Sequence, residues 1–163
     1  MKKMIVMAAL LAVAMSAQAE YEQVNMTVFG MDCAPCAHAI HVSMKAIAGV
    51  EKVDVDLNTG LVTIALNSGN AATMKQFNAA VEKNGFTHKD AKVVAKGKLS
   101  GTAAAPVFEV SGTGDRYQLV AASSAADISP LLGKTVVVAG TLPQVAKGKV
   151  PEKLSYVSIA EAR

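Results

Sequence analysis

Residues 30–40 read GMDCAPCAHAI and contain both cysteines of the chain, Cys33 and Cys36. Two thiols separated by two residues suit a metal clamp, a redox couple or a structural disulfide. Upstream, residues 24–28 alternate apolar and polar side chains, which is the pattern of a half-buried strand. Downstream, apolar residues recur every three or four positions over residues 37–47, the spacing of an amphipathic helix. The stretch is therefore predicted to join a strand to a helix, with Cys33 in the loop and Cys36 in the first helical turn.

The chain beyond this helix completes a small α+β unit. A hairpin is predicted over residues 53–66, because alternating apolar residues flank the turn sequence Asn58-Thr59-Gly60. Thr73 with Gln76 three residues later forms a capping box, which predicts the start of a second helix. A last strand is predicted over residues 86–93. The resulting order, β-α-β-β-α-β, is that of a ferredoxin-like fold.

This order, with Gly30-Met31-x-Cys33-x-x-Cys36 between the first strand and the first helix, resembles the heavy-metal-associated (HMA) domain. That domain occurs in copper chaperones, in the N-terminal regions of metal-pumping P-type ATPases and in the periplasmic mercury-binding protein. We assign residues 20–93 to it. The resemblance implies a protein of metal ion transport rather than an enzyme. It would bind one ion and pass it to a membrane metal transporter, a P-type ATPase or a permease.

The chemistry of the two cysteines also follows from their position. Backbone N–H groups and the positive end of the helix dipole favour thiolates at Cys33 and Cys36. Two soft thiolates suit Cu(I) and, by the resemblance, Hg(II), since both ions accept nearly linear coordination. Zn(II) normally takes four ligands, so two cysteines alone would leave it under-coordinated. The cofactor is thus expected to be one soft or borderline ion, with copper, zinc and mercury all open.

Asp32 is the candidate third ligand. In HMA domains this position is often a small polar residue, and an aspartate resembles the divalent-metal ATPase domains, whose carboxylate joins the two thiolates on zinc or lead. The alternative is that Asp32 caps the coming helix. Met31 is expected in the core, since in the family this methionine packs beneath the loop.

The three histidines and Phe86 are expected near the metal site but outside its ligand set. His38 and His41 lie opposite the apolar face of the first helix and are expected to be exposed. His88 follows the loop at Gly85 and Phe86, which in the family lies beside the metal loop. Phe86 stands where relatives often carry tyrosine or lysine, and we expect it to shield the site.

Two other uses of the cysteines stay open. Thiol-disulfide enzymes also place Cys-x-x-Cys at a helix start, usually after an aromatic residue. The chain has no tryptophan and has Asp32 in that position, where a negative charge disfavours the attacking thiolate. The other alternative is a structural adaptor that uses the pair as a disulfide.

The first 19 residues have the features of a secretory signal peptide: two lysines, an apolar run over residues 4–15 and the ending Ala17-Gln18-Ala19. We expect cleavage near Ala19 and a periplasmic protein not embedded in the membrane, because this run is shorter than the roughly 20 residues that span a bilayer. Of the 16 basic and 13 acidic residues, two lysines leave with this segment. The remaining net charge of +1 argues against a nucleic-acid partner.

The C-terminal residues 94–163 contain no cysteine, and their sequence pattern is that of short strands. Strands are predicted from about residue 96 and over residues 107–110, 116–120, 136–142 and 154–159, with a short helix over residues 127–132. Five short strands with one helix before the fourth predict a small all-β barrel. The segments FEVSGTGDRYQLV (108–120) and LLGKTVVVAGTL (131–142) resemble bacterial exported OB-fold domains. A docking or supporting role is expected for this OB-like barrel.

Overall fold

The computed structural model describes residues 20–110, 112–124 and 126–163, so the signal peptide predicted at residues 1–19 lies outside the described residues. Within the described ranges, every helix is too short or too polar to cross a membrane. The elements are β1 (Glu20–Phe29), α1 (Ala34–Lys45), β2 (Val50–Asp56), β3 (Leu61–Leu66), α2 (Met74–Lys83), β4 (Thr87–Thr102), β5 (Ala105–Val110), β6 (Asp115–Ala121), a 3-10 helix (Ser129–Leu131), β7 (Thr135–Leu142) and β8 (Lys153–Glu161).

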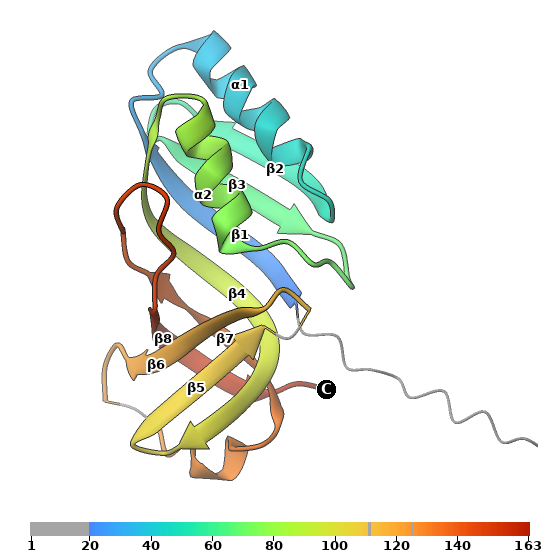
Figure 1. Cartoon of the computed structure of the whole chain (residues 1–163), viewed down its shortest axis with the longest axis vertical. Helices are drawn as coiled ribbons and strands as arrows, with labels where there is room; N and C mark the ends of the chain where they lie inside the picture. Colours follow the sequence, from blue (N-terminus) through green and yellow to red (C-terminus); the bar gives the residue numbers. More distant parts are fainter. Residues whose placement is uncertain (1–19, 111, 125) are drawn as a thin grey trace, which may run out of the picture.

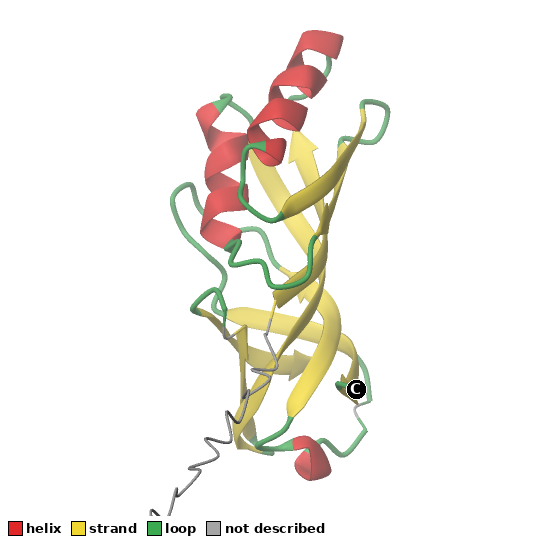
Figure 2. Ribbon diagram, turned by 90° about the vertical axis from the view of Figure 1, so that its right-hand side faces the viewer, coloured by secondary structure: helices red, strands yellow, loops and turns green. Residues whose placement is uncertain are grey.

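The helix-bearing half, from β1 to the first part of β4, has the β-α-β-β-α-β order that the sequence predicts. Its strands lie in the order β2-β3-β1-β4, and every neighbouring pair is antiparallel. Both helices cover the same face of this sheet (Figures 1 and 2). The predicted capping box begins α2, with Thr73 and Gln76 bonded reciprocally. This half is therefore the ferredoxin-like α+β unit expected.

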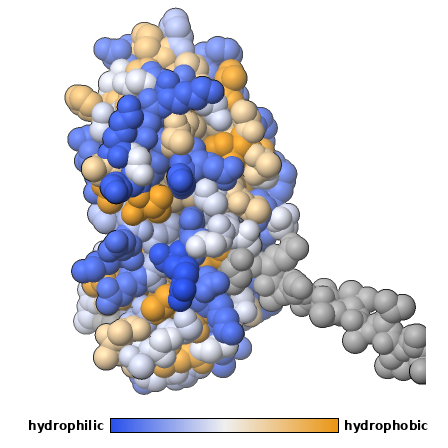
Figure 3. Space-filling model, in the orientation of Figure 1, coloured by the Kyte–Doolittle hydropathy of each residue, from blue (hydrophilic) through white to orange (hydrophobic). Residues whose placement is uncertain are grey.

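The core forms where the apolar sides of the helices meet the sheet. Side chains that alternate along β1 and β3 point towards the helices, and residues spaced three or four apart along α1 and α2 point back at them. These buried residues are Val24, Met26, Val28, Ile40, Met44, Val62, Ile64, Phe77 and Val81. On the outer, helix-bearing face hydrophilic and hydrophobic residues are interspersed (Figure 3). The helices thus follow the amphipathic pattern of the sequence.

The limits of strand β4 differ from those predicted from the sequence. The strand predicted over residues 86–93 and the one predicted from about residue 96 are a single strand of 16 residues. The expected domain boundary between residues 93 and 94 lies within it. Residues 87–96 pair with β1, residues 91–98 pair with β7, and residues 98–102 pair with β5. The strand continues because each part of it has a partner on at least one side.

The pairings of the C-terminal half form a closed cycle, β4-β5-β6-β8-β7-β4, which we call the C-terminal ring. The pair β6–β8 is parallel and the others are antiparallel. The helix expected over residues 127–132 is reduced to a 3-10 helix of three residues. The Asp127 carboxylate accepts a hydrogen bond from the Ser129 N–H (2.9 Å), and Gly133, at φ +80°, ends the segment.

A buried polar cluster joins the two halves. The Tyr21 hydroxyl donates to Asp115 Oδ2 (2.7 Å) and shares a hydrogen bond with the Tyr117 hydroxyl (2.6 Å). The same Asp115 oxygen accepts from the Met74 N–H (2.8 Å). Because Tyr21 and Tyr117 are at most 1% exposed, these bonds satisfy groups that water cannot reach. The cluster therefore connects the start of β1 and of α2 to β6.

We expect the free energy of unfolding to fall above pH 10. Burial, with Tyr117 and Asp115 nearby, raises the pKa of Tyr21 well above 10.0, and burial also raises the pKa of Tyr117. Above pH 10 the unfolded chain loses these protons while the folded chain retains them, so stability declines by up to about 1.4 kcal/mol per tyrosine per pH unit. Urea unfolding from about pH 8 to about pH 11.5 measures the decline. Tyr21→Phe should make it shallower, and an unchanged slope would contradict this account.

Candidate metal centre

The loop after β1 places the two cysteines at the start of α1. Gly30 has φ +92°, a left-handed conformation that suits glycine and turns the chain out of the strand. Met31 is 4% exposed and lies in the core, as predicted, so its side chain attaches the loop to the hydrophobic core. Cys33 is then the N-cap of α1, and Cys36 lies in its first turn. The structure thus places both cysteines where the sequence predicts them.

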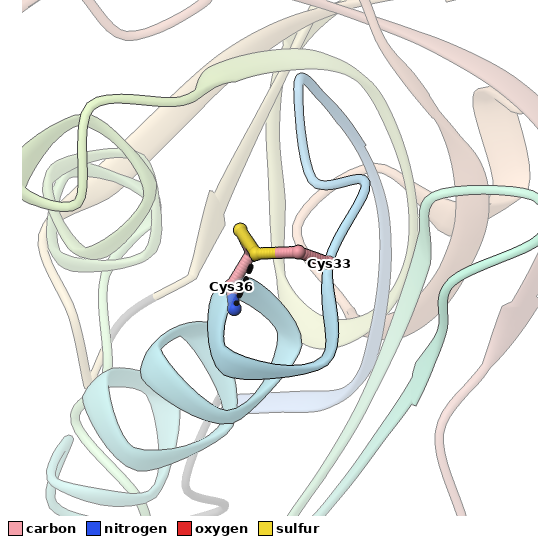
Figure 4. Close-up of a disulfide and its surroundings, with 2 residues drawn as sticks. All are labelled: Cys33 and Cys36. Carbon is pink, nitrogen blue, oxygen red and sulfur yellow. Dashed lines mark hydrogen bonds between the residues drawn. A yellow bond between two sulfur atoms is a disulfide. The ribbon is translucent and has the colours of Figure 1, made fainter.

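Cys33 and Cys36 are joined by a disulfide, with their Cα atoms 5.1 Å apart (Figure 4). Cys33 Sγ accepts a hydrogen bond from the Cys36 N–H at 3.2 Å, the dashed line in Figure 4. Both side chains are half-buried. The sulfur of Cys33 therefore already lies against a backbone donor at the positive end of the helix, where a thiolate is favoured.

Asp32 lies beside this pair and is exposed. One ligand atom from each of Asp32, Cys33 and Cys36 lies within 4.8 Å of the others, which is the geometry needed to meet at one ion. The N-cap of α1 is Cys33, so the capping role considered for Asp32 belongs to its neighbour. Among the described residues, this is the single group of three candidate ligands close enough to share an ion.

The histidines lie outside that group. His38 is exposed, as expected, whereas His41 is half-buried on the side of α1. His88 is 4% exposed, and its Nε2 lies 3.0 Å from Glu82 Oε1. This pair was not predicted from the sequence. The one sequence feature that could have indicated it is that Glu82 and His88 are six residues apart on either side of Gly85. A tight turn at Gly85 returns the chain past the end of α2.

Phe86 lies near Gly30, the first residue of the cysteine loop. Its ring atom Cδ1 lies 3.5 Å from the position that a Cβ at Gly30 would occupy. The side chain is half-buried and packs against the hydrophobic core. Phe86 thus faces the first residue of the loop, and its shielding of the site stays a prediction.

The arrangement has two chemical states. In the disulfide the two sulfurs are bonded to each other, and neither is a thiolate that a soft metal prefers. Reduction would give two thiols, one at the N-cap of α1 and one in its first turn. These can then face one ion, with the Asp32 carboxylate close enough to join them.

The comparison with protein families matches the helix-bearing half of the chain. Residues 25–87 match the model of the heavy-metal-associated domain. The copper chaperone CopZ of Staphylococcus saprophyticus is 34% identical over 65 residues, which cover 40% of this chain and 94% of that protein. The chain belongs to the heavy-metal-associated domain family.

Two solved structures are similar to part of this chain. A structure described as the CopZ metallochaperone is 30% identical and has a TM-score of 0.37; the match covers 39% of this chain and 94% of that one. The oxidized MerP from Ralstonia metallidurans CH34 is 22% identical with a TM-score of 0.38; the match covers 42% of this chain and 93% of that one.

Proposed function

We propose that this protein is a metal chaperone or scavenger that holds one soft ion between the Cys33 and Cys36 thiolates. The observation that carries the proposal is the placement of both sulfurs at the N-terminus of α1, in a loop open to solvent on the Asp32 side. Family membership supports it, since relatives are described as copper chaperones. The protein would act by binding and release rather than by catalysis.

Metal binding requires prior reduction of the disulfide. A dithiol reductant supplies two electrons and two protons and itself becomes a disulfide, while the Cys33–Cys36 bond breaks and two thiols form. Each thiol then loses its proton to solvent as its sulfur bonds to the ion. The redox state of the pair would therefore decide whether the protein can accept metal.

Release to a partner would proceed by ligand exchange. An incoming thiolate of the partner bonds to the ion first, and one of the two protein sulfurs then leaves, so the ion never enters solvent. A two-coordinate soft ion has room for such a third ligand. The proposed partner is a membrane metal transporter, either a P-type ATPase or a permease.

The identity of the ion depends on Asp32. Two thiolates alone favour Cu(I) or Hg(II), whereas a carboxylate close to both sulfurs adds the harder oxygen ligand that Zn(II) accepts. We propose Cu(I) as the principal cargo and Asp32 as the ligand that extends binding to zinc.

The rest of the chain is assigned by the same proposal. The leader at residues 1–19 would direct export to the periplasm and leave a protein that is not embedded in the membrane. The closed strand cycle, with its parallel β6–β8 pair, supports the assignment of residues 94–163 to an OB-like barrel. The barrel would serve as a docking or supporting module without nucleic acid.

Anaerobic native mass spectrometry of residues 20–163 tests the proposal, with Cu(I) and Zn(II) offered together. The reduced protein should retain one Cu(I) and the disulfide form none. Asp32→Asn should lower retention of Zn(II), offered alone, by about tenfold while leaving Cu(I) unchanged. If the reduced protein binds no ion while both thiols stay intact, the chaperone function is wrong.

A second candidate function rests on the disulfide itself. A Cys-x-x-Cys pair that forms a disulfide at a helix start is also the arrangement of thiol-disulfide oxidoreductases. Reduction of insulin by the reduced protein, at a rate above that of free dithiol, would favour this function. A pair that merely supports the fold would show neither insulin reduction nor metal binding.

A further inference from the structure

A hollow of about 320 Å³ lies on the face of the sheet that points away from the helices, the side opposite them in Figure 2. Lys92 and Val94 of β4 point to this outer face, whereas the intervening Val93 is buried in the core. Strands β1, β4, β7 and β8 form the walls, through these side chains: Gln23, Asn25, Lys92, Val94, Thr141 and Val157. We call this site the outer hollow.

Two β-bulges, one on either side of Val94, account for the outer hollow. Val94 pairs with Gln23 of β1, next to a register shift at Glu22. On its other side Val94 pairs with Ala139 of β7, next to a register shift at Val157 of β8. A bulge bends its strand and increases the local twist, so two bulges at one level curve the sheet around Val94. Val157 is 70% exposed as a result and leaves an apolar side chain at the edge of the hollow.

The polar side of the outer hollow is a row of three hydrogen-bond donors. Lys92 pairs with Asn25 on one side and with Thr141 on the other, so the three side chains are neighbours on the outer face. Gln23 Nε2 donates to Asn25 Oδ1 (2.9 Å), which leaves the amide nitrogen of Asn25 as the donor of this side chain. The row thus combines an ammonium, an amide N–H and a hydroxyl.

The apolar side of the outer hollow lies one step further along the same strands. Val94 and Ala139 follow the donor row by two residues, which is about 7 Å along a strand. Val157 lies beside them. All three are in contact with water, since Val94 and Ala139 are half-buried and Val157 is exposed. A ligand that covered them would remove apolar surface from water.

Lys92 gives the outer hollow its electrostatic preference. It is the one charged side chain among the described residues that line the hollow, and in the same part of the chain it forms no ion pair. The next lysine on this face, Lys96, pairs across the sheet with Glu20. Glu22, at the β1 bulge, is exposed and does not line the hollow. One unpaired cation beside two neutral donors favours a ligand with one anionic group.

We propose that the outer hollow binds a small aliphatic carboxylate. Its carboxylate accepts hydrogen bonds from the donor row of Lys92, Asn25 and Thr141, and charge-assisted bonds of this kind are stronger than neutral ones. Its hydrocarbon chain lies over Val94 and Val157. A hollow of about 320 Å³ is at the small end of the range of ligand sites, which fits a short chain. This binding site is separate from the cysteine pair and does not rest on the proposed chaperone function.

Hexanoate is the probe that tests the proposal. It is titrated into isotope-labelled protein of residues 20–163, in the disulfide form, and binding is followed by the chemical shifts of the backbone amides. We expect saturable shifts centred on Val94 and Gly140. Hexanol and hexylamine have the same hydrocarbon chain without the carboxylate, so they should bind at least about tenfold more weakly.

Three variants separate the contributions of the two sides. Lys92→Gln should weaken hexanoate binding about tenfold, because it retains a donor but loses the charge. Val157→Ser should weaken it about threefold, since part of the apolar cover is lost. Lys96→Gln is the matched control, because it makes the same change on the same face of β4 outside the hollow. It should leave the affinity within about twofold of the wild type.

The following outcomes would overturn the proposal. One is the absence of saturable shifts with hexanoate, or shifts centred elsewhere in the chain. Another is binding of hexanol as tight as that of hexanoate. Equal weakening by Lys96→Gln and Lys92→Gln would mean that anions are attracted to β4 in general. If Lys92→Gln fails to fold, by circular dichroism, Thr141→Val decides in its place and should weaken binding about threefold. A protein that binds no Cu(I) would end the chaperone function and leave the hexanoate titration valid.

Discussion

Cys36→Ser lowers Cu(I) affinity by at least about a thousandfold, because one of the two soft ligands is replaced by a hydroxyl that stays protonated at neutral pH. Only Cys33 and Asp32 then remain in the group of candidate ligands. A single thiolate with a carboxylate is a poor site for Cu(I), which prefers sulfur. Competition against a Cu(I) chelator, in anaerobic buffer with excess reductant, measures the change.

The fold should survive this substitution. Cys36 is half-buried, and its N–H donor to Cys33 Sγ belongs to the backbone and is retained. Ala34→Ser is the matched control, since it adds the same hydroxyl at an exposed position between the two cysteines and removes no sulfur. It should bind Cu(I) like the wild type. Wild-type affinity in Cys36→Ser would show that the ion, if bound, is held elsewhere.

Gly97→Val is expected to produce the largest loss of stability, about 3 kcal/mol or more of unfolding free energy. Gly97 is buried in β4, at the point where β1 ends and β5 begins as a pairing partner of this strand. A Cβ there would lie 2.3 Å from the Glu109 carbonyl oxygen and 2.8 Å from Phe108. The clash with the carbonyl cannot be relieved by a side-chain rotation, because Glu109 is fixed by its pairing with Lys98.

Urea unfolding followed by circular dichroism measures this loss. Lys98→Val introduces the same side chain at the next residue, which is exposed, and should change stability by no more than about 0.5 kcal/mol. A Gly97→Val protein as stable as Lys98→Val would mean that β4 and β5 can separate at this point without cost.

The sequence predicted those features that depend on local periodicity and local chemistry. The change of spacing at Cys36 predicted a helix with Cys36 in its first turn, and Thr73 with Gln76 predicted the capping box that begins α2. The cysteine pair was recognised for the same reason, since both ligands lie within four residues of each other. Met31 was correctly placed in the core by its resemblance to a methionine of the family.

Features that depend on distant residues were not predicted. Two strands were predicted, over residues 86–93 and from about residue 96, whereas in the structure they are one strand, in which Gly97 permits a close approach to Glu109. Tyr21 and Tyr117 are 96 residues apart, and nothing in either neighbourhood indicates the other. Attachment of the loop between β7 and β8 to α2, through Asn78 and Glu82, is equally non-local.

Strand β4 has a consequence for how the molecule unfolds. Two domains joined by a flexible linker can melt one after the other, because no backbone ladder crosses between them. Residues 91–96 of β4 instead pair with β1 on one side and with β7 on the other. Neither half can release this strand without exposing the hydrogen bonds of its neighbour. Amide hydrogens of β1 and β7 should therefore exchange with solvent through the same cooperative opening, as a single folding unit.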